Sequence, residues 1–134
     1  MTKINSPEVF KSERPKRMGF KFEKLVVWQK AVDLSDKVDT LTKKFPKEEV
    51  YILTSQVKRA ADSVSLNIAE GSTGQSNPEF NKFLGYALRS DIEVVACLYL
   101  AKRRKYISDE EFKELYSSCE EILVMINALR NSLK

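Results

Sequence analysis

A chain of 134 residues is long enough for one hydrophobic core without metal or disulfide cross-links. It contains no histidine, which removes the commonest general base and the commonest zinc ligand, and only four glycines and four prolines, a composition that favours long helices over a sheet with many turns. The net charge is +4, and the excess lies wholly in residues 1–24, which hold seven basic and three acidic side chains.

Residues 1–24 are expected to form a flexible basic tail, because they lack apolar periodicity and are interrupted by Pro and Ser. No apolar run precedes Val26, so no signal peptide or membrane span is expected and a cytoplasmic location is predicted. Cys97 and Cys119 lie inside helical patterns. We expect them to be buried thiols rather than a disulfide, which fits a reducing compartment.

Two amphipathic helices are predicted in the first half of the folded region, residues 25–134. One covers residues 25–45, where apolar side chains return every three or four positions until Pro46. The other covers residues 48–70, and Gly71 is expected to end it in a left-handed conformation. Its apolar stripe consists of Leu53, Val57, Ala60, Val64 and Ile68.

Two further helices are predicted in the second half. The third begins with Asn77 as N-cap and Pro78 in the first turn, and the fourth begins with a capping box formed by Ser108 and Glu111. Four helices of about 20–25 residues joined by short loops predict an all-α fold, an antiparallel up-down-up-down four-helix bundle. The third helix ends at the basic cluster, which we define as Lys102, Arg103, Arg104 and Lys105.

A row of polar side chains runs beside the apolar stripe of the second predicted helix. Ser and Asn are poor choices for an exposed helix interior, and a carboxylate near a helix C-terminus opposes the helix dipole. We therefore expect a polar network or a subunit interface, in which Arg59 pairs with Glu93 or Glu70; a plain solvated face is the alternative. The polar row consists of Gln56, Arg59, Ser63, Asn67 and Glu70, and its expected partners on the third helix are Ser90 and Glu93.

No catalytic, cofactor-binding or metal site is predicted. The adjacent acidic pairs point in different directions on a helix, and no P-loop or dinucleotide-binding motif is present. A di-iron site of the Glu-x-x-His type needs histidine. A non-enzymatic protein without a cofactor is therefore expected.

The basic cluster is the only dense group of cations in the folded region. Cations at a helix C-terminus complement the helix dipole, which is its simplest explanation. A second interpretation is a surface for RNA or DNA, whose affinity would fall steeply with salt and would rise in an oligomer. A third is a protein-interaction scaffold in which Tyr51, Tyr86 and Tyr99 contact a partner.

Three motifs occur in order between about residues 22 and 133. They are 25-LVVWQKA-31, then 56-QVKRAADSV-64 with 67-NIAEG-71, then a helix carrying Glu79, Phe80, Phe83, Leu84, Ala87, Ser90 and Glu93. Together they resemble the four-helix-bundle family encoded within intervening sequences of bacterial 23S ribosomal RNA genes.

The resemblance implies a ring-like homopentamer with no known enzymatic activity. A related branch of that family serves as the accessory protein of diversity-generating retroelements, which implies a basic ring that holds nucleic acid and a reverse transcriptase. Accordingly, the alternative to direct nucleic-acid binding is a scaffold or accessory subunit for an enzyme such as a reverse transcriptase. This chain departs from the family pattern after Gly71, where Ser72-Thr73-Gly74-Gln75-Ser76 replaces a Gly-Arg step and removes a cation.

Overall fold

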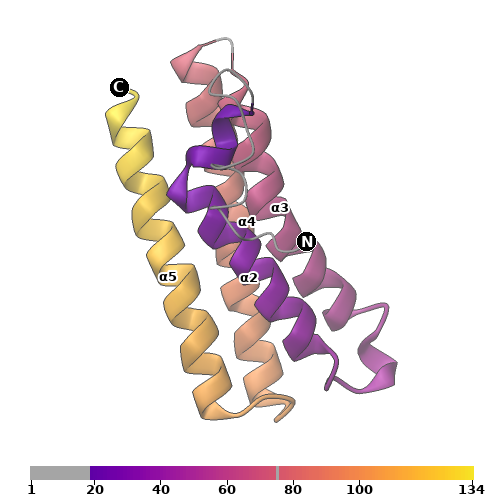
Figure 1. Ribbon diagram of the computed structural model, residues 1–134. Helices are drawn as coiled ribbons and strands as arrows, with labels where there is room; N and C mark the ends of the chain where they lie inside the picture. Colours follow the sequence, from indigo (N-terminus) through magenta and orange to yellow (C-terminus); the bar gives the residue numbers. More distant parts are fainter. Residues whose placement is uncertain (1–18, 75) are drawn as a thin grey trace.

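The structure is a computed structural model that describes residues 19–74 and 76–134 of the chain. In this part, four long helices lie side by side and alternate in direction along the chain, and no strand is present (Figure 1). The predicted all-α four-helix bundle is confirmed. The helices are α2 (Val26–Thr42), α3 (Leu53–Ser72), α4 (Asn77–Arg103) and α5 (Asp109–Ser132), with short 3-10 turns η1 (Lys21–Lys24) and η2 (Lys47–Glu49).

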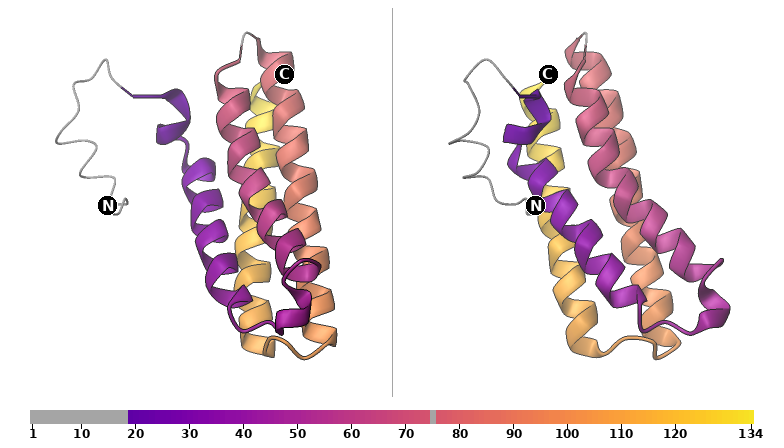
Figure 2. Two further views of the ribbon diagram at one scale, coloured as in Figure 1. Left: turned by 90° about the vertical axis from the view of Figure 1, so that its right-hand side faces the viewer. Right: turned by 45° about the vertical axis from the view of Figure 1, so that its right-hand side comes forward.

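The order of the helices places two loops at one end of the bundle. The α2–α3 loop and the α4–α5 loop lie at this end, whereas the α3–α4 loop and the C-terminus lie at the other (Figure 2). We call the first of these the basic end and define it as residues 43–52 and 102–108. None of the helices in the described ranges combines the length and the apolar character that crossing a membrane requires.

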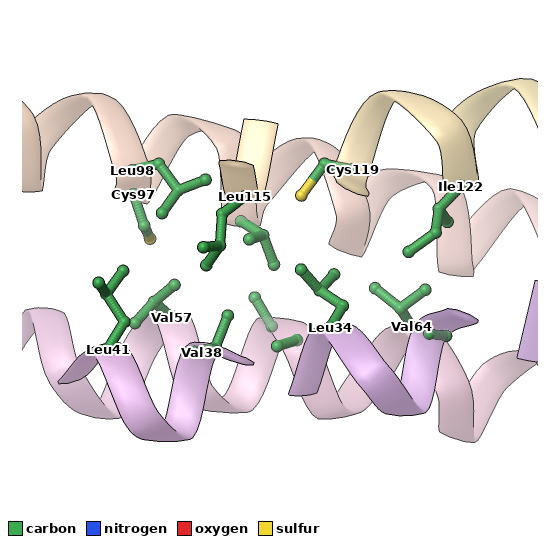
Figure 3. Close-up of a cluster of buried hydrophobic side chains, with 14 of the residues drawn as sticks. Leu34, Val38, Leu41, Val57, Val64, Cys97, Leu98, Leu115, Cys119 and Ile122 are labelled. Atoms are coloured by element: carbon green, nitrogen blue, oxygen red, sulfur yellow. The ribbon is translucent and has the colours of Figure 1, made fainter. Parts of the chain in front are cut away.

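The core is formed by the apolar faces of all four helices. Leu41 of α2 and Val57 of α3 lie opposite Leu98 of α4, and Leu34 and Val64 lie opposite Cys119 and Ile122 of α5 (Figure 3). Burying a large aliphatic side chain contributes about 1.5–3 kcal/mol, so these residues supply much of the stability. The whole predicted apolar stripe of α3 is buried, and both cysteines are buried and free, as the sequence predicts.

The start of α3 differs from the prediction. Residues 47–49 form the separate turn η2, and Ile52 has non-helical dihedrals of φ −122° and ψ −99°, so α3 begins at Leu53 and not at residue 48. Similarly, α2 ends at Thr42. Phe45 lies beyond it, yet it is buried and its ring centroid lies 5.4 Å from that of Tyr106.

The expected left-handed conformation of Gly71 is wrong. Gly71 is a buried residue inside α3, which ends at Ser72, and its C-cap Thr73 has right-handed dihedrals of φ −73° and ψ −3°. A Cβ atom at Gly71 would lie only 2.6 Å from the Cβ of Phe83 on α4. The glycine is therefore required because α3 and α4 approach closely, and not because the chain turns.

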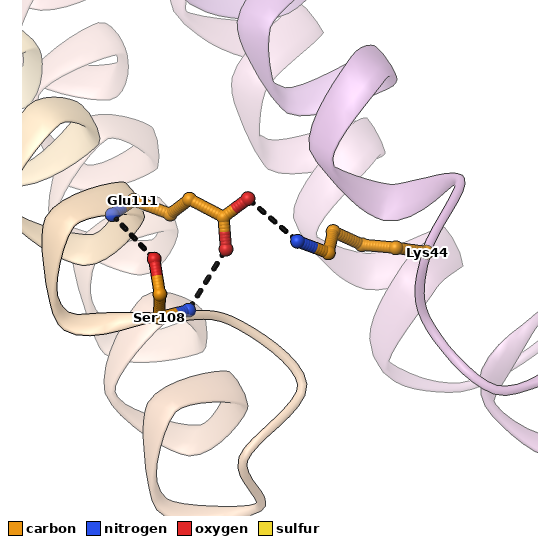
Figure 4. Close-up of polar contacts among 3 residues, drawn as sticks. All are labelled: Lys44, Ser108 and Glu111. Carbon is orange, nitrogen blue, oxygen red and sulfur yellow. Dashed lines mark hydrogen bonds and ion pairs between the residues drawn. The ribbon is translucent and has the colours of Figure 1, made fainter.

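The two predicted N-caps have different outcomes. Ser76, and not Asn77, caps α4: its Oγ accepts a hydrogen bond of 3.3 Å from the backbone N–H of Glu79. The capping box of α5 is confirmed. Ser108 Oγ accepts from Glu111 N–H at 3.1 Å, and Glu111 Oε1 accepts from Ser108 N–H at 2.8 Å (Figure 4).

The folded unit begins before residue 25. Residues 21–24 form η1, where the Phe22 ring packs edge-on against Trp28 with centroids 4.7 Å apart. The Gln29 side-chain amide donates a 2.8 Å hydrogen bond to the carbonyl of Glu23. The last residues of the predicted flexible tail thus belong to the bundle, while residues 1–18 lie outside the described residues.

Candidate functional site

The basic cluster lies at the C-terminal end of α4. Arg104 is the C-cap, and the chain then closes the helix with two backbone hydrogen bonds, from Lys105 N–H to Lys102 O at 3.0 Å and from Tyr106 N–H to Ala101 O at 2.9 Å. This is the Schellman arrangement, whose residue after the C-cap is left-handed and usually Gly. Here that residue is Lys105, with φ 64°.

Lys105 carries a measurable conformational cost. It is the one non-glycine residue with positive φ among the described residues. Left-handed backbone costs a residue with a Cβ roughly 1–2 kcal/mol because the Cβ approaches the carbonyl oxygen. A lysine occupies a position that a glycine would fill with less strain.

Ion pairs divide the basic cluster into two kinds of cation. Lys102 Nζ lies 3.8 Å from Asp109 Oδ1 and 4.6 Å from the centroid of the Phe112 ring, and Arg104 Nη1 lies 3.4 Å from Glu49 Oε2. Arg103 and Lys105 are exposed and form no ion pair within residues 19–74 and 76–134. Within the described residues, two of the four predicted nucleic-acid-binding cations therefore form no ion pair, and the other two are paired with carboxylates of the fold.

Glu49 connects the two loops of the basic end. Its Oε2 accepts a 2.7 Å hydrogen bond from Tyr106 Oη in addition to the contact with Arg104, and its Oε1 accepts from Leu53 N–H at 3.3 Å. The hydrogen bond to this carboxylate raises the pKa of the Tyr106 phenol. The α2–α3 loop is thereby fixed against the α4–α5 loop.

An exposed apolar segment follows Glu49 directly. Tyr51 is 92% exposed, and its neighbours Val50 and Ile52 are exposed as well. The sequence marked Tyr51 as a residue that contacts a partner. Its position at the same end as the basic cluster is information that only the tertiary structure provides.

The polar row forms a partial network on α3. Asn67 Nδ2 donates to both the carbonyl oxygen and Oγ of Ser63 at 2.9 Å, and Ser90 Oγ on α4 donates to Ser63 Oγ at 2.9 Å. About two helical turns before Ser63, Gln56 Nε2 donates a hydrogen bond of 3.0 Å to Glu93 Oε2 on α4. The predicted contacts of the row with Ser90 and Glu93 are present.

Arg59 and Glu70 do not join this network. Both side chains are exposed, and neither forms an ion pair in the described part of the chain. The expected pairing of Arg59 with Glu93 or Glu70 is therefore not formed within the protomer, because Arg59 lies on the solvent side of the row and Glu93 bonds Gln56 instead. The assignment of the row to a subunit interface stays a prediction.

Exposed apolar side chains lie on α3, which carries the polar row, and on α4, which carries its partners Ser90 and Glu93. Leu66 of α3 is 64% exposed, and α4 exposes four further large side chains. Apolar groups left in water on neighbouring helices are typical of surfaces that bind another protein. The four on α4 are Tyr86, Ile92, Tyr99 and Leu100.

The sequence assigned no role to the carboxylate of Asp91, which stands at a core position of the helical repeat Leu84, Ala87, Asp91, Val94. Asp91 is 1% exposed, its Oδ1 has no hydrogen-bond partner, and its one polar neighbour of note is the Cys119 thiol. Burial raises the pKa of Asp91 to about 7. The signal available in the sequence was a charged residue at a core position of the helical period.

The remaining chemistry of the described residues is sparse. Burial raises the pKa of the Cys97 thiol to about 11 and raises that of Cys119 further, so both sulfurs stay protonated and unreactive at neutral pH. No group of three or more His, Cys, Asp or Glu side chains in the described ranges could hold a metal ion. A groove of about 320 Å³ lies between α2 and α5 and is lined by Leu41, Leu115, Thr40 and charged side chains.

These features define a small four-helix-bundle protein with a mixed polar and apolar lateral face and a charged end. The family model described as 23S rRNA-intervening sequence protein matches residues 23–128, and the chain belongs to this family. This confirms the resemblance noted in the sequence.

One solved structure supports the fold independently. It is a crystal structure of a protein with unknown function from the S23 ribosomal protein family of Bacteroides thetaiotaomicron. The two proteins share 24% sequence identity with a TM-score of 0.73, over 78% of this chain and 97% of the other. No match was found among curated proteins.

Proposed function

We propose that this protein is a non-catalytic subunit of a homo-oligomer that binds RNA or DNA through its basic end. The observation that carries this proposal is the pair of exposed, unpaired cations Arg103 and Lys105, together with the left-handed backbone of Lys105. Strained residues of this kind persist where a side chain is needed in a particular place. A purely structural helix cap would be better served by glycine at residue 105.

Self-association is the second part of the proposal, and the family resemblance suggests a pentamer. Leu66 and Ile92 expose apolar area on α3 and α4. Arg59 and Glu70 offer opposite charges that form no ion pair among the described residues 19–74 and 76–134. A cyclic oligomer would repeat the free cations of the basic end around one axis. Phosphate contacts then add up, and the salt dependence of binding steepens.

Two measurements test the proposal together. Light scattering after size exclusion gives the number of copies, and a lone protomer would contradict the oligomer. Fluorescence anisotropy with labelled RNA and DNA, repeated across a salt series, is expected to give an affinity that falls linearly on a log–log plot. Undetectable or salt-independent binding by the purified oligomer would contradict the nucleic-acid role.

A matched pair of variants separates the basic end from general charge. The double variant Arg103→Ala, Lys105→Ala is expected to weaken binding and to reduce the slope with salt by about two phosphate contacts per protomer. The double variant Lys21→Ala, Lys24→Ala removes the same charge from η1 at the opposite end and is expected to have a smaller effect. Equal losses in both would show that only net charge matters.

The second candidate is a protein-interaction scaffold or an accessory subunit for a nucleic-acid enzyme such as a reverse transcriptase. The exposed Tyr86 and Tyr99 on α4 favour it, because tyrosine is enriched at protein interfaces. Partners captured by the tagged protein that survive nuclease treatment would favour this candidate. Loss of the partners after nuclease treatment would favour direct nucleic-acid binding.

A further inference from the structure

We infer that Tyr51 is a stacking platform for an unpaired base of a single-stranded nucleic acid, whose phosphates contact Arg103 and Lys105. This inference rests on the proposed function and names the class of its ligand. Proteins that bind single strands combine cations that follow the backbone with aromatic rings on which bases stack. The basic end brings both kinds of group together.

The first support is the position of Tyr51. Glu49 bonds Arg104 and Tyr106, which flank Lys105 in the chain, and Tyr51 follows Glu49 by two residues. Two residues span at most about 7 Å, so Tyr51 lies near the point where Glu49 connects the α2–α3 loop to the α4–α5 loop, at the basic end of the bundle.

The second support is that the Tyr51 ring has no partner. The other four tyrosines each pack against a phenylalanine ring, with centroids between 4.8 and 5.6 Å apart. Tyr51 has no such ring contact among the described residues and is 92% exposed. An aromatic side chain left in water on a fixed loop does not contribute to the core, so its ring is available to a ligand.

The third support is electrostatic. Three acidic side chains at or beside the basic end, Glu49, Asp109 and Glu111, are each paired with a lysine or arginine of the fold. The cations Arg103 and Lys105 form no ion pair among the described residues. A nucleotide complements both kinds of group, because its base offers a flat π face to the Tyr51 ring and its phosphate offers a negative charge to Arg103 and Lys105. A duplex buries the faces of its bases and offers only phosphates, so the ring favours single strands. Exposed Glu48 and Glu110 weaken the local potential, and binding by one protomer is expected to be modest and strongly salt-dependent.

The test uses the full chain, with labelled oligouridine and oligothymidine of about 12 nucleotides and a duplex of equal length. Tyr51→Ala is expected to weaken single-strand binding by about 5- to 150-fold, because stacking of one base is worth about 1–3 kcal/mol, and to leave duplex binding unchanged. Tyr51→Phe retains the ring and is expected to bind like the original protein. Val50→Ala removes apolar area from the same loop without removing a ring and serves as the matched control.

Tyr51→Trp provides a direct spectroscopic reading. Stacking on a base is expected to quench the emission of the new indole when oligouridine is added, over the background of half-buried Trp28. Absence of quenching under conditions where anisotropy reports binding would overturn the inference. Circular dichroism and light scattering establish that each variant is folded and has the assembly state of the original protein.

The outcomes separate the inference from the proposed function. If Tyr51→Ala binds single strands as the original protein does, or if duplex and single strand bind equally well, the inference fails while nucleic-acid binding stands. If the original protein binds no nucleic acid, both fail. If Tyr51→Ala loses its partner subunits, Tyr51 belongs to a contact between copies of this chain, and the inference is wrong.

Discussion

The carboxylate of Asp91 on α4 lies against the thiol of Cys119 on α5, inside the core of the bundle. Among the described residues, Asp91 is the one Asp, Glu, Lys or Arg that is buried, and its Oδ1 lacks a hydrogen-bond partner. Desolvation raises the pKa of the carboxyl from 3.8 to about 7, and the hydrogen bond from Cys119 lowers it in part. The folded protein therefore holds the proton more tightly than the unfolded chain does.

This linkage predicts that stability falls as pH rises through neutrality. The contribution of the protonated carboxyl is fully present below pH 4 and is lost as pH rises through about 7, by an amount on the order of 4 kcal/mol. Urea unfolding at pH 5 and pH 8 is expected to give a lower midpoint at pH 8. Asp91→Asn removes the titrating group, and its midpoint should change much less over the same interval. An equal pH dependence in both proteins would show that another group is responsible.

The capping box of α5 provides a prediction at acidic pH. Lys44 Nζ lies 2.6 Å from Glu111 Oε2, and this ion pair together with the Ser108 N–H lowers the pKa of the Glu111 carboxyl. The resulting stabilisation is present above the unfolded pKa near 4.5 and is lost as pH falls through the lower folded pKa.

Ser108→Ala is expected to reduce the unfolding free energy at pH 7 by about 1 kcal/mol. Ser117→Ala, an exposed serine in the middle of α5, is the control and should not destabilise the protein.

Two glycines in helices are expected to respond in opposite ways to alanine. A Cβ at Gly71 would lie 2.6 Å from Phe83 Cβ, so Gly71→Ala must separate α3 from α4 and should destabilise the protein by roughly 1–3 kcal/mol. At Gly85 the nearest atoms belong to the flexible end of Arg130 at 3.6 Å, so Gly85→Ala should stabilise it by about 0.5–1 kcal/mol. Thermal melting of the two variants measures both signs. A loss of stability in Gly85→Ala, or none in Gly71→Ala, would contradict the packing argument.

Lys105 is expected to show opposite effects on stability and binding. Lys105→Gly relieves the left-handed backbone at φ 64° and should raise the unfolding free energy by about 1 kcal/mol, while removing a cation should weaken nucleic-acid binding. Lys105→Ala keeps the Cβ, so it should weaken binding to the same extent without the gain in stability. If Lys105→Gly is no more stable than Lys105→Ala, the left-handed residue is not strained.

The helical architecture followed from local patterns because each depends on neighbours a few residues away. The apolar stripe of α3 and the Ser108 capping box of α5 are both set by the spacing of side chains on one helix. The misplaced helix start at residue 48 and the misplaced cap at Asn77 have a related cause. Neighbouring residues have similar local preferences at a helix end, and packing of the loop decides between them.

The roles of individual residues depended on contacts between distant segments. The sequence identified Gly71, the basic cluster and Tyr51 as notable, but it could not tell that Gly71 faces Phe83 or that Glu49 brings the loop of Tyr51 to Arg104. It also expected an ion pair for Arg59 that the protomer does not form, because which carboxylate a cation reaches depends on helix rotation and register.

Amphipathic periodicity thus determined by itself that four helices must form and which faces they bury, since burying apolar area is the dominant favourable term and it acts on each helix as a whole. Asp91 marks the limit of that argument, because its position in the repeat indicated burial without indicating what surrounds it. Only the tertiary structure decided that its hydrogen-bonding neighbour is a thiol. Within the part of the chain that the structure describes, it also decided that two of the four clustered cations are paired and that one tyrosine ring packs against no other ring. These outcomes are set by directional contacts over a few ångströms between helices, and a one-residue shift in register would change each of them.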